Sequence, residues 1–196
     1  MRVVRIGVLA SGGGSILDAI CARSIPVAVV VVDRPCGATD VAERHAVEAL
    51  VVERSSFGKD FDRWGYTQRV ADALVERNID LVVMAGFGTV LEQPVHDAFP
   101  GRIVNTHPAL LPSFPGWHGV EDALEYGVKV TGCTVHVATL EVDAGPILAQ
   151  EAVPVLDDDT VESLHERIKA VERELYPRTI RRILDGELQL PLGSAA

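Results

Sequence analysis

A short apolar run ends in two polar side chains that can do chemistry. Ile103 and Val104 are typical of a buried strand, and Asn105 and His107 follow directly. Because residues two apart on an extended chain project to one side, both side chains are predicted to face the same place. An amide donor can stabilise a developing oxyanion, and an imidazole can stabilise charge and transfer a proton.

The loop after this strand is fixed in shape by its composition. Residues 108–116 hold three prolines and end in a glycine. Proline has a fixed φ and no N–H, so such a loop keeps its shape without regular secondary structure. In parallel sheets, ligands bind beyond the carboxyl ends of the strands, so we expect this strand end to carry the chemistry.

Asp143 is the third candidate for acid–base chemistry. It precedes an Ala-Gly-Pro sequence between two strand-like segments, where a lone aspartate is most often an ordinary turn residue. With Asn105 and His107, however, it completes a set suited to direct acyl-type transfer, in which the carboxylate keeps the imidazole charged or accepts the proton. For His136, which lies inside a strand-like segment, a structural role is favoured over a catalytic one.

Two other kinds of chemistry find no support in the sequence. There is no Gly-x-Ser-x-Gly elbow and no cysteine beside a histidine, so a covalent nucleophile is not predicted. No pair of histidines has zinc-ligand spacing with a third ligand nearby, so no metal site is predicted.

A glycine turn stands between the first apolar strand and the first helical pattern. It consists of Gly12, Gly13, Gly14 and Ser15. Backbone N–H groups at a helix start suit a phosphate, but a tight turn that needs positive φ has the same composition, and the pattern favours neither. The turn lacks the lysine of a P-loop, and Leu17 stands where a dinucleotide motif needs glycine. A monophosphate is therefore favoured over a pyrophosphate.

The elements that must position these residues alternate along the chain. Strand-like segments are predicted at residues 3–10, 25–32, 51–52, 80–85 and 102–104, and helical patterns lie between them, notably at 38–50, 60–78 and 92–98. This βαβ alternation predicts an α/β fold with a doubly wound, mostly parallel open sheet of Rossmann-like type.

The pattern changes after the proline loop. A helix is predicted at 121–126, followed by two strand-like segments at 128–138 and 146–155 that are close enough to form an antiparallel C-terminal edge. A long helix follows at 160–184, with a break expected near Pro177. We expect one domain over residues 1–189 and a flexible tail over 190–196.

The net charge, the cysteines and the apolar runs of the sequence limit its binding partners and its location. The chain of 196 residues carries a net charge of −10, which makes it a poor candidate for binding a polyanion such as a nucleic acid. Its three cysteines lie in or next to apolar stretches and are predicted to be free, buried thiols in a reducing cytoplasm. No apolar run approaches the length of a membrane span, so no membrane association is expected.

Four motifs together resemble a known family. They are residues 105–112, 114–116, 132–136 and 142–147. Their combination closely resembles the 10-formyltetrahydrofolate-dependent formyltransferases, and the resemblance runs from the first strand to about Pro177. Within that family, the match favours the members that formylate glycinamide ribonucleotide in de novo purine synthesis.

The resemblance implies a role for each matching residue. Asn105, His107 and Asp143 match the family's catalytic residues, which implies direct attack of the ribonucleotide amine on the formyl group of 10-formyltetrahydrofolate. The residues implied in binding the ribonucleotide and its phosphate are Gly12, Gly13, Gly14, Ser15 and Glu172. The residues implied in binding folate are Arg63, Phe87, Gly88, Thr89, Val90, Leu91, Ala138, Thr139, Leu140 and Glu141, with Asn105 and Asp143. Leu111-Pro112 is a candidate cis bond.

The sequence departs from the family pattern at three places. Gly13 and Ile16 stand where the family commonly has asparagine, so backbone N–H groups must hold more of the phosphate. Gly88-Thr89 stands where many members have Met-Arg. The residues after His118 form a variable stretch, and His118 receives no firm role.

Chain length, charge and the catalytic set distinguish the expected function from three alternative functions. Methionyl-tRNA formyltransferase is a longer enzyme that needs a basic surface for tRNA. Formyltetrahydrofolate hydrolase carries an additional N-terminal domain. A non-catalytic nucleotide-binding module would not need Asn105, His107 and Asp143 together. We therefore expect an enzyme with small-molecule partners, the ribonucleotide and a reduced folate, while a monomer and a homodimer both remain open.

Overall fold

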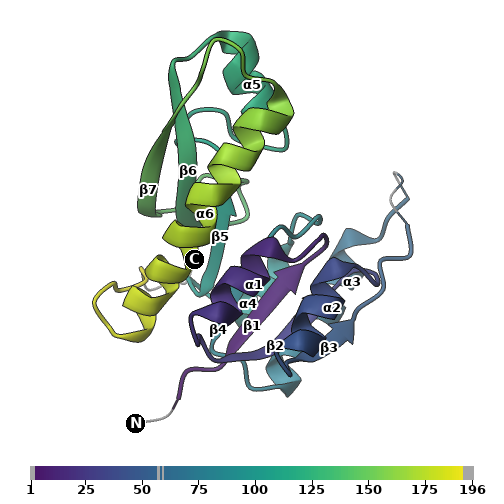
Figure 1. The fold of residues 1–196 in the computed structure, drawn as a ribbon. Coiled ribbons are helices and arrows are strands. Elements are labelled where there is room, and N and C mark those ends of the chain that lie inside the picture. Colours follow the sequence, from purple (N-terminus) through teal and green to yellow (C-terminus); the bar gives the residue numbers. More distant parts are fainter. Residues whose placement is uncertain (1–2, 57, 59, 192–196) are drawn as a thin grey trace. The chain divides into compact units, whose positions relative to one another are not determined.

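The strands confirm the predicted fold class. The computed structural model describes residues 3–56, 58 and 60–191. Its strands follow the order β3-β2-β1-β4-β5-β6-β7 in one seven-stranded sheet. The chain divides into two compact units, one that runs to Val104 and one that spans Asn105–Leu190 (Figure 1). The prediction of a single domain over 1–189 stays a prediction, and most of the predicted tail lies outside the described residues.

The first unit holds the parallel strands. Their bounds are β1 (Ile6–Ala10), β2 (Val27–Val32), β3 (Glu48–Val51) and β4 (Leu81–Met84), with β5 (Ile103–His107) beginning at its end. β1 pairs in parallel with β2 and β4, and β2 pairs with β3. All residues of β1 and β4 are buried, as expected for strands covered on both faces.

Four helices complete this unit. They are α1 (Ser15–Ala22), α2 (Gly37–Arg44), α3 (Arg63–Glu76) and α4 (Gln93–Ala98). α1 packs against α2, and α3 packs against α4. One face of α3 is apolar and buried, since Tyr66, Val70 and Leu74 are fully buried.

One predicted boundary in this unit is wrong. The helix predicted over 38–50 ends at Arg44, and the strand predicted at 51–52 lies at Glu48–Val51. Residues 48–51 pair with Val29–Val32 of β2, so pairing with the sheet overrides the helical pattern. Ala46 takes a positive φ of 54° between the two elements, and this residue lets the chain reverse.

The second unit is built on an antiparallel pair and a long helix. β6 (Val130–Val137) pairs with β7 (Ile147–Pro154), as predicted, and α5 (Gly119–Tyr126) and α6 (Val161–Leu184) complete the unit. α6 packs against both strands, and its residues Leu164, Ile168 and Ile180 are fully buried. The break expected at Pro177 is absent, because Pro177 lies inside a continuous, packed helix.

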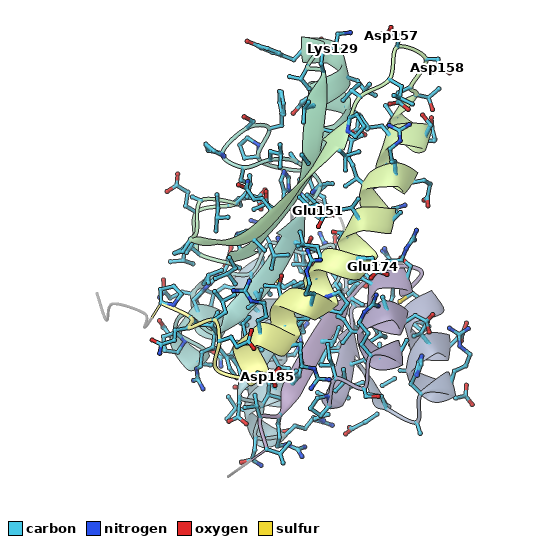
Figure 2. The ribbon with its side chains drawn as sticks, turned by 60° about the vertical axis from the view of Figure 1, so that its left-hand side comes forward. Lys129, Glu151, Asp157, Asp158, Glu174 and Asp185 are labelled. Atoms are coloured by element: carbon cyan, nitrogen blue, oxygen red, sulfur yellow. The ribbon has the colours of Figure 1, made fainter. Side chains whose placement is uncertain are left out.

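The surface of the second unit carries several ion pairs. Lys129 Nζ lies 3.1 Å from Asp157 Oδ1, and both residues lie at one end of the unit (Figure 2). Glu151 on β7 pairs with Arg178 on α6 at 2.9 Å. Such exposed pairs contribute little stability, so the apolar face of α6 carries most of its attachment.

The part of the chain that the structure describes contains neither a membrane-spanning helix nor a cluster of metal ligands. None of the helices at residues 3–56, 58 and 60–191 is long and apolar enough to cross a membrane. Over the same ranges, no group of three histidine, cysteine or acidic side chains is arranged to hold a metal ion. Cys21, Cys36 and Cys133 are free thiols, as predicted, but only Cys133 is buried, and the predicted burial is wrong for the half-buried Cys21 and Cys36.

Candidate functional site

The last residues of β5 carry two of the three predicted catalytic side chains. Asn105 and His107 belong to the strand itself and not to the loop after it. The predicted strand ends at Val104, but β5 extends to His107. His107 is buried and Asn105 is half-buried. A rigid strand therefore holds both groups, which suits a site that needs fixed geometry.

His107 is held at both ring nitrogens. Its Nε2–H donates to the carbonyl oxygen of Phe114 at 2.7 Å, so this nitrogen carries a proton. Its Nδ1 lies 3.3 Å from Asp143 Oδ2. The second contact is longer than a strong charge-assisted hydrogen bond, so Nδ1 is the nitrogen best able to serve another acceptor.

Asp143 lies in the turn between β6 and β7 with its side chain turned inward. Its φ of 56° is a left-handed conformation, and its side chain is only 7% exposed. The Gly116 N–H donates to Oδ2 at 2.8 Å. Burial by itself raises the pKa of Asp143, but hydrogen bonds from His136 and Gly116 and the charges of His107 and His136 hold it below its ordinary value. The group is thus a stable carboxylate.

His136 joins this cluster, although the sequence favoured a purely structural role for it. Its Nε2 lies 3.2 Å from Asn105 Nδ2 and 3.5 Å from Asp143 Oδ1, and its side chain is 1% exposed. Its Nδ1–H donates to the Val137 carbonyl at 3.1 Å. The signal that could have found it is its place in the 132–136 motif, which the family resemblance already contains.

The protonation of His136 controls the hydrogen bonding of the Asn105 amide. When His136 Nε2 is unprotonated, it accepts from the Asn105 amide; when protonated, it can only donate, and Asp143 is the acceptor in reach. Protonation of His136 therefore releases the Asn105 amide for another acceptor. A carboxylate between two imidazoles, with an amide donor beside it, is equipped to move a proton and stabilise an oxyanion.

Glu172 is buried on α6 beside β5. Its Oε1 accepts from the Thr106 hydroxyl at 2.8 Å. Burial raises the pKa of this carboxyl above its ordinary value, against the lowering effect of Thr106 and two cations. A buried carboxylate with a single hydrogen-bond donor destabilises the fold, which is typical of residues kept for function.

Replacing Glu172 with glutamine is expected to stabilise the protein near neutral pH. The glutamine keeps an acceptor for Thr106 but carries no charge, so we expect Tm to rise by about 3 °C at pH 7. Since the raised pKa makes the wild type lose stability as pH rises above 4.5, the gain should vanish at pH 4 and below. Thermal unfolding across pH measures this.

A control for this substitution lies on the same helix. Glu166 is exposed, and its hydrogen bond and ion pair with Lys169 lower its pKa. Glu166→Gln should therefore show no gain at pH 7. If Glu172→Gln proved less stable than the wild type at pH 7, burial would not be the dominant influence on this carboxyl.

The glycine turn lies in the first unit. Gly14 is tightly packed, whereas Gly12 and Gly13 face open space. Gly14 has a φ of 78°, and a Cβ there would lie 2.8 Å from the Ala38 backbone, so the position requires glycine. A Cβ at Gly12 or Gly13 would meet nothing within 4 Å. Ser15 is exposed, whereas Ile16 is buried in the core. The turn thus presents Gly12, Gly13 and Ser15 outward from the start of α1.

The segment 87–91, predicted to bind folate, is also in the first unit. Phe87, Thr89 and Leu91 are buried, and Gly88 and Val90 are half-buried. Arg54 Nη1 donates to both the Gly88 carbonyl and the Thr89 hydroxyl at 3.1 Å. The Thr89 side chain is therefore engaged within the protein, which leaves mainly backbone groups of this segment for a ligand.

The remaining predicted binding residues are more exposed. Arg63 lies at the start of α3 and is half exposed. Its Nη1 lies 3.9 Å from Glu92 Oε1. In the second unit Ala138 is half-buried, and Thr139, Leu140 and Glu141 are exposed between β6 and Asp143. The Leu111-Pro112 bond is cis, as predicted. His118 is exposed at the start of α5 and makes no side-chain capping bond there.

A doubly wound α/β sheet with an acid–base cluster at a strand end defines a class of group-transfer enzymes. The chain matches the formyl transferase family over residues 4–180, and it belongs to that family. It is 49% identical to the phosphoribosylglycinamide formyltransferase of Mycobacterium tuberculosis strain H37Rv over 176 residues, which cover 87% of this chain and 80% of that protein.

Two further comparisons agree. The trifunctional purine biosynthetic protein adenosine-3 of Homo sapiens is 38% identical over 96% of this chain, which spans 19% of that protein. The crystal structure of glycinamide ribonucleotide transformylase 1 from Symbiobacterium toebii matches with a TM-score of 0.90 and 43% identity, covering 96% of this chain and 91% of that chain.

Proposed function

We propose that this enzyme transfers the formyl group of 10-formyltetrahydrofolate to the amine of glycinamide ribonucleotide in purine biosynthesis. The observation that carries the proposal is the cluster of Asn105, His107, His136 and Asp143, which supplies donors and a proton acceptor but no serine or cysteine nucleophile. The family and the relative at 49% identity support the donor and the acceptor named here.

The proposed reaction is a direct displacement at the formyl carbon. The ribonucleotide amine attacks that carbon, and the carbonyl electrons move to oxygen to form a tetrahedral oxyanion. Asn105 Nδ2 and His107 Nδ1 donate to the oxyanion. Asp143 takes the proton that the amine loses, the bond from carbon to the folate nitrogen breaks, and that nitrogen receives the proton. No covalent bond to the protein forms.

Each unit contributes binding residues to this proposal. In the first unit, Gly12, Gly13, Gly14 and Ser15 are proposed to hold the ribonucleotide phosphate, and Arg63 with residues 87–91 to contact folate. In the second unit, Glu172 is proposed to hold the ribonucleotide, and Ala138, Thr139, Leu140 and Glu141 to contact folate. The three free thiols suit a reducing cytoplasm, which we propose as the location.

Gly13 offers a clean test of the phosphate assignment. An aspartate there fits the open space, but its charge repels a phosphate, so Gly13→Asp should raise KM for the ribonucleotide about tenfold or more. Gly13→Asn is the matched control, since it has the same shape without the charge and a side-chain donor in addition, so it should leave KM for the ribonucleotide at or below the wild-type value. A change in KM confined to the folate would contradict the assignment, and steady-state kinetics with each substrate varied decides between them.

The proposed function is tested by offering three acceptors. The protein is mixed with 10-formyltetrahydrofolate and with glycinamide ribonucleotide, methionyl-tRNA or water alone, and release of the deformylated folate is followed. We expect turnover with the ribonucleotide only. Equal turnover without it would show a hydrolase, and turnover with the tRNA alone would show the other transferase.

A further inference from the structure

The loop between β5 and α5 holds the catalytic cluster through two backbone groups. The Phe114 carbonyl fixes His107, and the Gly116 N–H fixes Asp143. Phe114 and Gly116 have φ values of 54° and 94°, and a non-glycine residue keeps such a conformation only where its surroundings impose it. The geometry of the cluster therefore depends on how this loop is anchored.

The first part of the loop is anchored by two side chains from the antiparallel pair. The Thr134 hydroxyl donates to the Ala109 carbonyl at 2.7 Å and accepts from the Leu111 N–H at 3.0 Å. Gln150 Nε2 donates to the Leu111 carbonyl at 2.8 Å and to the Thr134 hydroxyl at 3.0 Å. Side chains thus satisfy three backbone groups that a proline-rich loop cannot pair within a sheet.

The Thr134 hydroxyl and the Gln150 amide hydrogens are fully used in the anchor. A threonine hydroxyl has one donor and two acceptor sites, and Thr134 uses all three. Gln150 uses both amide hydrogens, and it stands directly opposite Thr134 in the β6–β7 register. Loss of either group leaves a loop carbonyl or N–H unpaired, and the loop must then move to find another partner.

We propose that Gln150 and Thr134 are positioning residues for the transfer reaction. They hold residues 109–111, so that the same loop brings the Phe114 carbonyl to His107 and the Gly116 N–H to Asp143. This inference rests on the proposed function, because it assumes that His107 and Asp143 act on the formyl group. Gln150 acts through the loop, since its side-chain amide donates to Leu111 and Thr134.

Gln150→Glu tests the proposal with little change of shape. It places a carboxylate oxygen against the Leu111 carbonyl, which repels it. We expect kcat to fall by about tenfold to a hundredfold, while KM for each substrate changes less than about threefold, because binding groups elsewhere are untouched. The control is Glu151→Gln on the next residue, which breaks only the exposed pair with Arg178 and should leave kcat unchanged.

A second pair of variants and a spectroscopic readout separate positioning from simple stability. Thr134→Ser keeps the hydroxyl and should retain most of kcat, whereas Thr134→Val should lose it as Gln150→Glu does. The ¹⁵N chemical shifts of the His107 ring report whether Nε2 carries a proton. In the wild type we expect Nε2 to be protonated, because the Phe114 carbonyl accepts from it, and in Gln150→Glu and Thr134→Val we expect Nε2 to be protonated in only part of the molecules.

The outcomes are distinguishable. Wild-type kcat and unchanged His107 shifts in folded Gln150→Glu would overturn the positioning role, even if the proposed function holds. If the wild type formylates no ribonucleotide, the proposed function fails, but the His107 shifts still test the anchor without substrate. If Gln150→Glu does not fold, the comparison of Thr134→Ser with Thr134→Val decides the matter, and equal kcat in those two would overturn the role.

Discussion

Replacing His107 with alanine should lower kcat by a hundredfold or more. The substitution removes the imidazole proposed to stabilise the oxyanion, and a positioned donor of this kind is worth about two to three powers of ten in rate. It also leaves the Phe114 carbonyl without its donor, so we expect a loss of stability of about 1 kcal/mol. Steady-state kinetics and thermal unfolding measure the two effects separately.

The matched control for His107 is a histidine from the same unit. His165 lies half-buried on α6, and burial lowers its pKa. His165→Ala should keep its kcat within about twofold of the wild type, because no proposed step uses it. If His107→Ala kept a near-full rate in a folded protein, the assignment of β5 as the catalytic strand would be wrong.

Asp143→Asn should also lower kcat by about a hundredfold. Asparagine tolerates the left-handed φ of 56° and still accepts from Gly116, so the shape of the turn is kept. Only the charge between His107 and His136 is lost, and with it the proton acceptor. Steady-state kinetics with both substrates measure the loss, with Asp157→Asn as a control because that carboxyl is almost fully exposed.

The pH dependence of the wild-type Asp143 carboxylate has a defined sign. Because the pKa of Asp143 lies below its ordinary value of 3.8, the carboxylate stays ionised at pH 5. Its contribution to stability is full above that ordinary value and is lost only as pH falls below it. Any loss of wild-type activity between pH 7 and pH 5 should therefore have another cause. A rate that falls with protonation of Asp143 in that range would contradict this.

Much of the fold could be predicted from local patterns. Apolar β-branched runs such as Val29–Val32 fit only a strand buried on both faces, and the two-residue spacing of Asn105 and His107 predicted that both side chains project to one side. The boundary between α2 and β3 could not be predicted, because the position of β3 is decided by pairing with β2. Similarly, packing of α6 overrides the break expected at Pro177.

The candidate site was less accessible to sequence reasoning. The three residues of the predicted catalytic set carry their own motifs, but His136 looks like an ordinary strand residue until its contacts with Asn105 and Asp143 are seen. Gln150 has no local signal at all, since its partner Leu111 is 39 residues away in sequence. Residues that act through long-range hydrogen bonds leave no spacing pattern, and only the folded chain identifies them.

A single-turnover reaction with a ¹³C-labelled formyl donor tests the central claim most directly. Enzyme in excess over 10-formyltetrahydrofolate is mixed with glycinamide ribonucleotide, and the label is followed by NMR and mass spectrometry. Direct transfer predicts that all label appears in the formylated ribonucleotide as the donor disappears. Labelled formate released without the ribonucleotide, or label attached to the protein, would contradict the account.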